Sequence, residues 1–97
     1  MSRSLLERKL DDVVSRLRTL REELGVVDEQ LAALVEVADD TRLRALVSET
    51  PIAEREFEEA QRHVDAMARQ RDVLQADIES LERVQDELLD RLVAAWR

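Results

Sequence analysis

A chain of 97 residues allows one domain, and this one is 39% charged and 2% aromatic, with a single glycine and a single proline. The net charge of −8 argues against nucleic acid and anionic membranes as general partners, because phosphate binding needs clustered Lys and Arg. The lack of cysteine excludes disulfides, thiol catalysis and thiolate metal sites.

The first predicted helix covers about residues 3–48 and carries hydrophobic residues at alternating spacings of four and three. These residues are Leu6, Leu10, Val13, Leu17, Leu20, Leu24, Val27, Leu31, Leu34 and Ala38. A period of 3.5 residues sustained over more than four heptads is typical of a coiled coil. Because Asp39, Asp40 and Thr41 can start a new helix, we expect either a kink at 39–42 with a short third helix near 40–48, or one continuous helix.

A turn is predicted at residues 48–51, where Thr50 is a good N-cap and Pro51 suits a first helical position. The second helix is predicted over about residues 51–96. Its repeat consists of Phe57, Ala60, Val64, Met67, Arg71, Leu74, Ile78, Leu81, Gln85, Leu88, Leu92 and Ala95. Helices joined by a short turn pack side by side, so the sequence predicts an all-α, antiparallel two-helix coiled-coil hairpin, one domain over residues 1–97.

The register follows if the numbers of paired residues add up to 98, which centres the series on the predicted turn. The layers then run from Leu6/Leu92 to Ala45/Ala53. Two layers hold polar residues, Arg71 and Gln85, whose polar ends are expected to reach out of the interface. Such residues help to define register in coiled coils.

The outer face of the second helix pairs acids with arginines at i,i+4, as in Glu58–Arg62, Asp65–Arg69 and Glu79–Arg83, which indicates a solvated face. His63 is the only histidine and is expected on the surface. No spacing of residues predicts a catalytic, cofactor-binding or metal-binding site. We therefore expect a protein that is not an enzyme and has no cofactor.

Two apolar surfaces are candidates for binding a protein partner. Leu43, Leu46, Val47 and Ile52 lie near the turn, where they either fold over Phe57 through the kink or form a docking surface. Gly25, Val26 and Ala33 form a small-residue patch on the outer face of the first helix. The sequence predicts a protein–protein interaction or scaffold module that forms a homodimer, or alternatively an architectural spacer or filament subunit.

The region of the turn is acidic, with Glu49, Glu54 and Glu56, and the stretch 53–57 (AEREF) resembles the tip of the N-terminal coiled coil of the Gre transcript-cleavage factors. The resemblance covers about a dozen residues and implies a transcription regulator that inserts an acidic tip into RNA polymerase. The second globular domain of those factors has no counterpart here. Fourteen arginines against one lysine resemble the composition of small coiled-coil proteins of actinobacteria.

No apolar run approaches the roughly 20 residues of a membrane span, and the N-terminal residues lack a hydrophobic leader. From these observations we expect a cytoplasmic protein with neither membrane nor nucleic acid as a direct partner.

Overall fold

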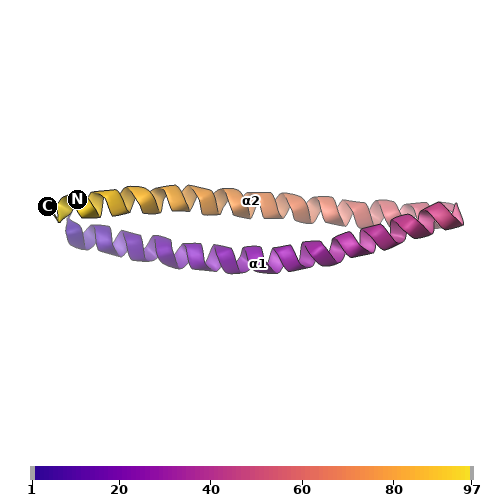
Figure 1. Cartoon of the computed structure of the whole chain (residues 1–97), viewed down its shortest axis with the longest axis horizontal. Coiled ribbons are helices and arrows are strands. Elements are labelled where there is room, and N and C mark those ends of the chain that lie inside the picture. Colours follow the sequence, from indigo (N-terminus) through magenta and orange to yellow (C-terminus); the bar gives the residue numbers. More distant parts are fainter. Residues whose placement is uncertain (1, 97) are drawn as a thin grey trace. The chain divides into compact units, whose positions relative to one another are not determined.

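The computed structural model describes residues 2–96 and contains two helices, α1 (Arg3–Ser48) and α2 (Pro51–Ala95) (Figure 1). No strand occurs in this part of the chain. The helices divide into two compact units, the first holding α1 up to Leu24 with α2 from Leu74, and the second holding residues 25–73 with the turn. In each unit a segment of α1 packs antiparallel to a segment of α2, so the predicted helical hairpin is confirmed.

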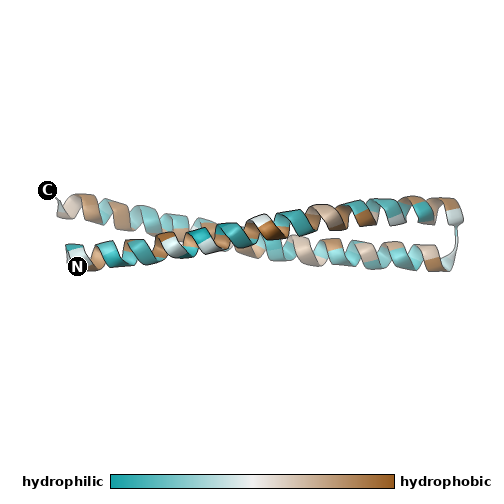
Figure 2. Ribbon diagram, turned by 90° about the horizontal axis from the view of Figure 1, so that it is seen from below, coloured by the Kyte–Doolittle hydropathy of each residue, from teal (hydrophilic) through white to brown (hydrophobic). Residues whose placement is uncertain are grey.

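The core of the first unit is built from the predicted repeat. Its buried members are Leu6, Val13, Leu17, Ile78 and Leu88, against which Leu10, Leu20, Leu24, Leu81 and Leu92 pack. Leu17 is the most deeply buried of them, with 0% of its surface exposed. Figure 2 shows hydrophobic residues alternating with hydrophilic ones along both helices, as a coiled-coil repeat requires.

The second unit buries smaller side chains at the equivalent positions. Val27, Ala38, Ala53, Ala60 and Thr41 are buried, and the remaining residues of the predicted layers are half-buried. Every residue placed in a layer between Leu6/Leu92 and Ala45/Ala53 is therefore buried or half-buried. Ala95, which closes the predicted repeat, is exposed.

Helix α1 runs without interruption through residues 39–42, so of the two alternatives the continuous helix is confirmed, and the kink with a short third helix near 40–48 does not form. Thr41 is buried, and its hydroxyl donates to the carbonyl oxygens of Val37 and Ala38 at 2.9 and 3.0 Å. This hydroxyl is satisfied inside the helix and does not cap a new one. An ion pair between Asp40 and Arg44 spans the next turn.

Both helices are capped at their N-terminal ends, α2 by the predicted Thr50. The Ser2 hydroxyl accepts from the backbone N–H of Leu5 at 3.2 Å, and the Thr50 hydroxyl accepts from that of Ala53 at 3.2 Å. After α1 ends, Glu49 adopts a left-handed conformation with a φ of 51°, while its N–H donates to the carbonyl oxygen of Ala45 at 3.1 Å. Glycine usually occupies this position, because a side chain makes the left-handed conformation costly.

Replacing Glu49 with glycine is expected to raise the free energy of unfolding by about 1 kcal/mol, since glycine adopts a positive φ without the steric cost of a Cβ atom. Urea denaturation followed by circular dichroism measures the change. Glu49→Gln, which keeps the Cβ atom, is the matched control and should leave stability unchanged. A glycine variant no more stable than this control would contradict the prediction.

Each unit contains one ion pair between its helices. In the first unit Arg21 lies 3.3 Å from Glu82, and in the second the Arg71 Nε donates to the Asp28 carboxylate at 2.5 Å. Arg71 occupies a layer opposite Val27, and its polar end reaches out of the interface, as the sequence predicts.

Candidate protein interaction surfaces

Four large apolar side chains surround the turn in the second unit, and we call them the tip patch: Leu43, Leu46, Val47 and Ile52. Their exposed fractions run from 63% for Leu43 to 85% for Val47. Because α1 does not kink and these side chains are exposed, they do not fold over Phe57, which is half-buried. An exposed apolar group of this kind on a small protein is typical of a docking surface.

Three exposed carboxylates border the tip patch. Glu49 lies in the turn, Glu54 lies in the first turn of α2, and Glu56 follows two residues later. The N-terminal end of a helix favours acidic residues, so the helix itself accounts for Glu54. The left-handed Glu49 has no such local explanation, because glycine would suit its conformation better.

The patch predicted on the outer face of α1 is also exposed. Val26 is 53% exposed, and Gly25 and Ala33 lie on the surface near it. A Cβ atom added at Gly25 would meet nothing within 4 Å, so the space beside this glycine is open. A further helix could approach α1 closely here, in agreement with the small side chains.

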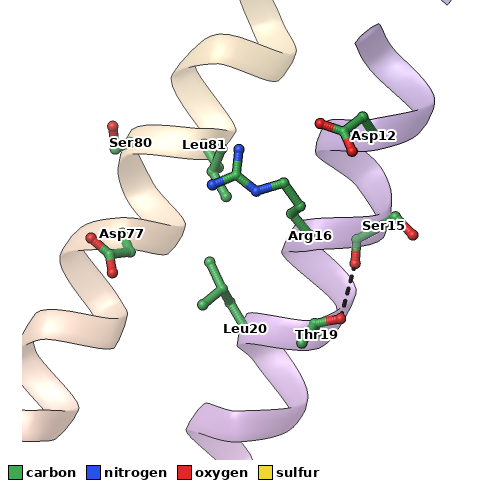
Figure 3. A pocket seen from close by; sticks show the side chains of 8 residues that line it. All are labelled: Asp12, Ser15, Arg16, Thr19, Leu20, Asp77, Ser80 and Leu81. Carbon is green, nitrogen blue, oxygen red and sulfur yellow. Dashed lines mark hydrogen bonds between the residues drawn. The ribbon is translucent and has the colours of Figure 1, made fainter. Parts of the chain in front are cut away.

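A groove between the helices of the first unit escaped the sequence prediction (Figure 3). It has a volume of about 540 Å³ and is lined by Asp12, Ser15, Arg16, Thr19, Leu20, Asp77, Ser80 and Leu81. The Arg16 side chain extends from α1 across the groove toward α2 (Figure 3). A smaller neighbouring hollow is lined by Lys9, Asp12, Val13, Val84, Glu87, Leu88 and Arg91. The only signal in the sequence for these hollows is the heptad spacing of the polar residues that flank the core positions.

The outer face of α2 is solvated, as predicted, since Glu58, Arg62, Asp65, Arg69, Glu79 and Arg83 are all exposed, although these acids and arginines form no ion pairs with one another. Asp65 accepts a hydrogen bond from the Gln61 amide at 3.0 Å, and Glu79 accepts one from the Gln75 amide at 3.2 Å. The ion pairs formed within residues 2–96 are Arg3–Glu7, Arg21–Glu82, Asp40–Arg44 and Asp28–Arg71. The outer arginines of α2 therefore point into solvent without a carboxylate partner in the described part of the chain.

Residues 2–96 contain no group of three or more His, Cys, Asp or Glu side chains that could hold a metal ion, and His63 is exposed. Trp96 is 63% exposed, and the Arg3 guanidinium lies over its ring at 4.1 Å from the centroid. Between residues 2 and 96, neither helix has an apolar stretch long enough to span a bilayer.

Comparisons with protein-family models, curated proteins and solved structures found no match for this chain. The likeness to the Gre factors consequently stays a resemblance in the residues around the turn.

Proposed function

We propose that this protein is a non-enzymatic interaction module that binds a protein partner through the tip patch. The observation that carries the proposal is the exposure of Leu43, Leu46, Val47 and Ile52 around one turn, on helices whose other apolar repeat is already used to form the core. Burying such side chains in an interface contributes about 1.5–3 kcal/mol each, which favours association.

The surrounding charge favours a cationic partner surface. Glu49, Glu54 and Glu56 would pair with Lys or Arg at the rim of the interface, where charges mainly affect the association rate and its dependence on salt. A transcription regulator that inserts this acidic turn into RNA polymerase is a special case of the same mode of binding, and the resemblance of the stretch 53–57 supports it.

The test compares partner capture by the wild type and by a variant with all four tip-patch residues changed to Ser. Capture should be lost, because the apolar contact is removed, while circular dichroism should show unchanged helicity, because these side chains are exposed. A second variant with Glu49, Glu54 and Glu56 changed to Gln should bind more weakly and lose its sensitivity to salt.

The matched control changes four exposed apolar residues of the first unit to Ser: Leu5, Val14, Leu89 and Val93. This control should capture the same partner as the wild type. If the tip variant captures that partner equally well, the tip patch is not the binding surface.

A further inference from the structure

The groove of the first unit lies on one side of the helix pair, and the heptad positions of its lining residues identify that side. If the core residues Leu17 and Leu20 of α1 are heptad positions a and d, then Thr19 is a c position and Arg16 a g position. On α2, Ser80 and Asp77 are likewise c and g. The groove therefore opens on the side formed by the c and g positions of both helices (Figure 3).

Several c and g positions are apolar in the second unit, whereas Gln30, His63 and Gln70 occupy other g positions. On α1 the apolar ones are Val26, Ala33 and Val37, and on α2 they are Ala66 and Val73. Val26 is 53%, Val37 51% and Val73 62% exposed, and both alanines are exposed too. We call these five residues the side patch. Five exposed apolar side chains thus lie on the side of the second unit that is formed by the c and g positions.

The opposite side of the second unit is closed by the Asp28–Arg71 ion pair, where Asp28 is an e position. Among the described residues, the side of the c and g positions carries no ion pair or side-chain hydrogen bond from one helix to the other. The side patch therefore lies on the side of this unit where no polar contact joins the two helices.

Two rows of unpaired charge border the side patch. On α1, Glu29 and Glu36 occupy successive f positions, and on α2, Arg62 and Arg69 do the same. None of the four belongs to an ion pair within residues 2–96. The f position points away from the helix's own partner, so the acidic row and the basic row cannot meet inside one chain.

We propose that a second copy of this chain packs on the side patch, with both copies running in the same direction around a twofold axis along the helices. Helix α1 of each copy then lies antiparallel to α2 of the other, as it does to its own α2. Residues at equal height again have numbers that add up to 98, which places Glu29 opposite Arg69 of the second copy and Glu36 opposite Arg62. The twofold axis makes each pair occur twice.

Charge complementarity favours this arrangement over the reverse one. If α1 packed against α1 of the second copy, the two helices would run antiparallel and Glu29 would face Glu36, so like charges would oppose association. This inference extends the proposed role in protein association to a second surface. It does not use the tip patch, so the two proposals can fail separately.

The experiment measures the molar mass by light scattering from micromolar to near-millimolar concentration. The wild type should be a dimer in the upper part of this range. Glu29→Arg with Glu36→Arg, and separately Arg62→Glu with Arg69→Glu, should each weaken dimerisation about tenfold or more, because like charges then face each other at all four pairs. An equal mixture of the two variants should form a heterodimer, in which every pair is opposite again.

A control with Asp11→Arg and Glu79→Arg changes the net charge as much as the first variant and should dimerise at least as well as the wild type. The Ser variant of the tip patch should also remain dimeric. A wild type that is monomeric throughout, charge-reversed variants that dimerise normally, or a mixture that forms no heterodimer would each overturn the proposal. Loss of the dimer in the tip variant would overturn it too, since the copies would then meet at the tip patch.

Discussion

Replacing Leu17 with alanine is expected to lower the free energy of unfolding by about 3 kcal/mol. Leu17 is the most deeply buried large side chain, and it lies among Val13, Ile78 and other core residues of the first unit. Truncation removes apolar contact area and leaves a cavity, and both effects destabilise the folded state. Urea denaturation followed by circular dichroism measures the loss.

The matched control is Leu46→Ala, because the same atoms are removed from a side chain that is 64% exposed. Its effect should stay below about 0.5 kcal/mol, as for most surface substitutions. Equal losses in the two variants would contradict the packing of the first unit, since they would mean that Leu17 is no better buried than Leu46.

Replacing Asp39 with proline is expected to cost about 3 kcal/mol and to reduce the helix content. Asp39 lies in the interior of the continuous helix α1, where proline removes a backbone hydrogen bond and clashes with the preceding turn. Its exposed side chain makes no hydrogen bond in the described structure, so the substitution tests the backbone alone.

Asp39→Ala is the control and should keep or slightly raise stability, since alanine favours the helix. Both free energies come from denaturation curves, and the helix content comes from circular dichroism. If proline were tolerated at this position, residues 39–42 would form a break between two helices, and the tip-patch residues would be free to fold over Phe57.

The hydrophobic period alone predicted most of the fold. Alternating spacings of three and four leave only one face of each helix to bury, and a single strong turn signal at Thr50 and Pro51 brings those faces together antiparallel. The register followed because pairing numbers that add up to 98 leaves no apolar layer without a partner. The tip patch could also be proposed, because Leu43, Leu46, Val47 and Ile52 lie outside the repeat.

Short sequence patterns did not predict the local structure where two different contacts were open to the same residue. The Asp39-Asp40-Thr41 stretch has the composition of a helix start, yet Thr41 is buried against the partner helix and its hydroxyl bonds inside α1. Along α2 the i,i+4 spacing offered Asp65 a choice between partners, and the structure pairs it with Gln61.

The sequence by itself therefore determined the all-α hairpin, its turn and its buried faces, because one period repeated over the whole chain outweighs any local ambiguity. The tertiary structure decided the continuity of α1 and the difference between the two sides of the second unit. Those features depend on which side chains meet across the helices, as Asp28 meets Arg71, and spacing within one helix cannot specify such contacts.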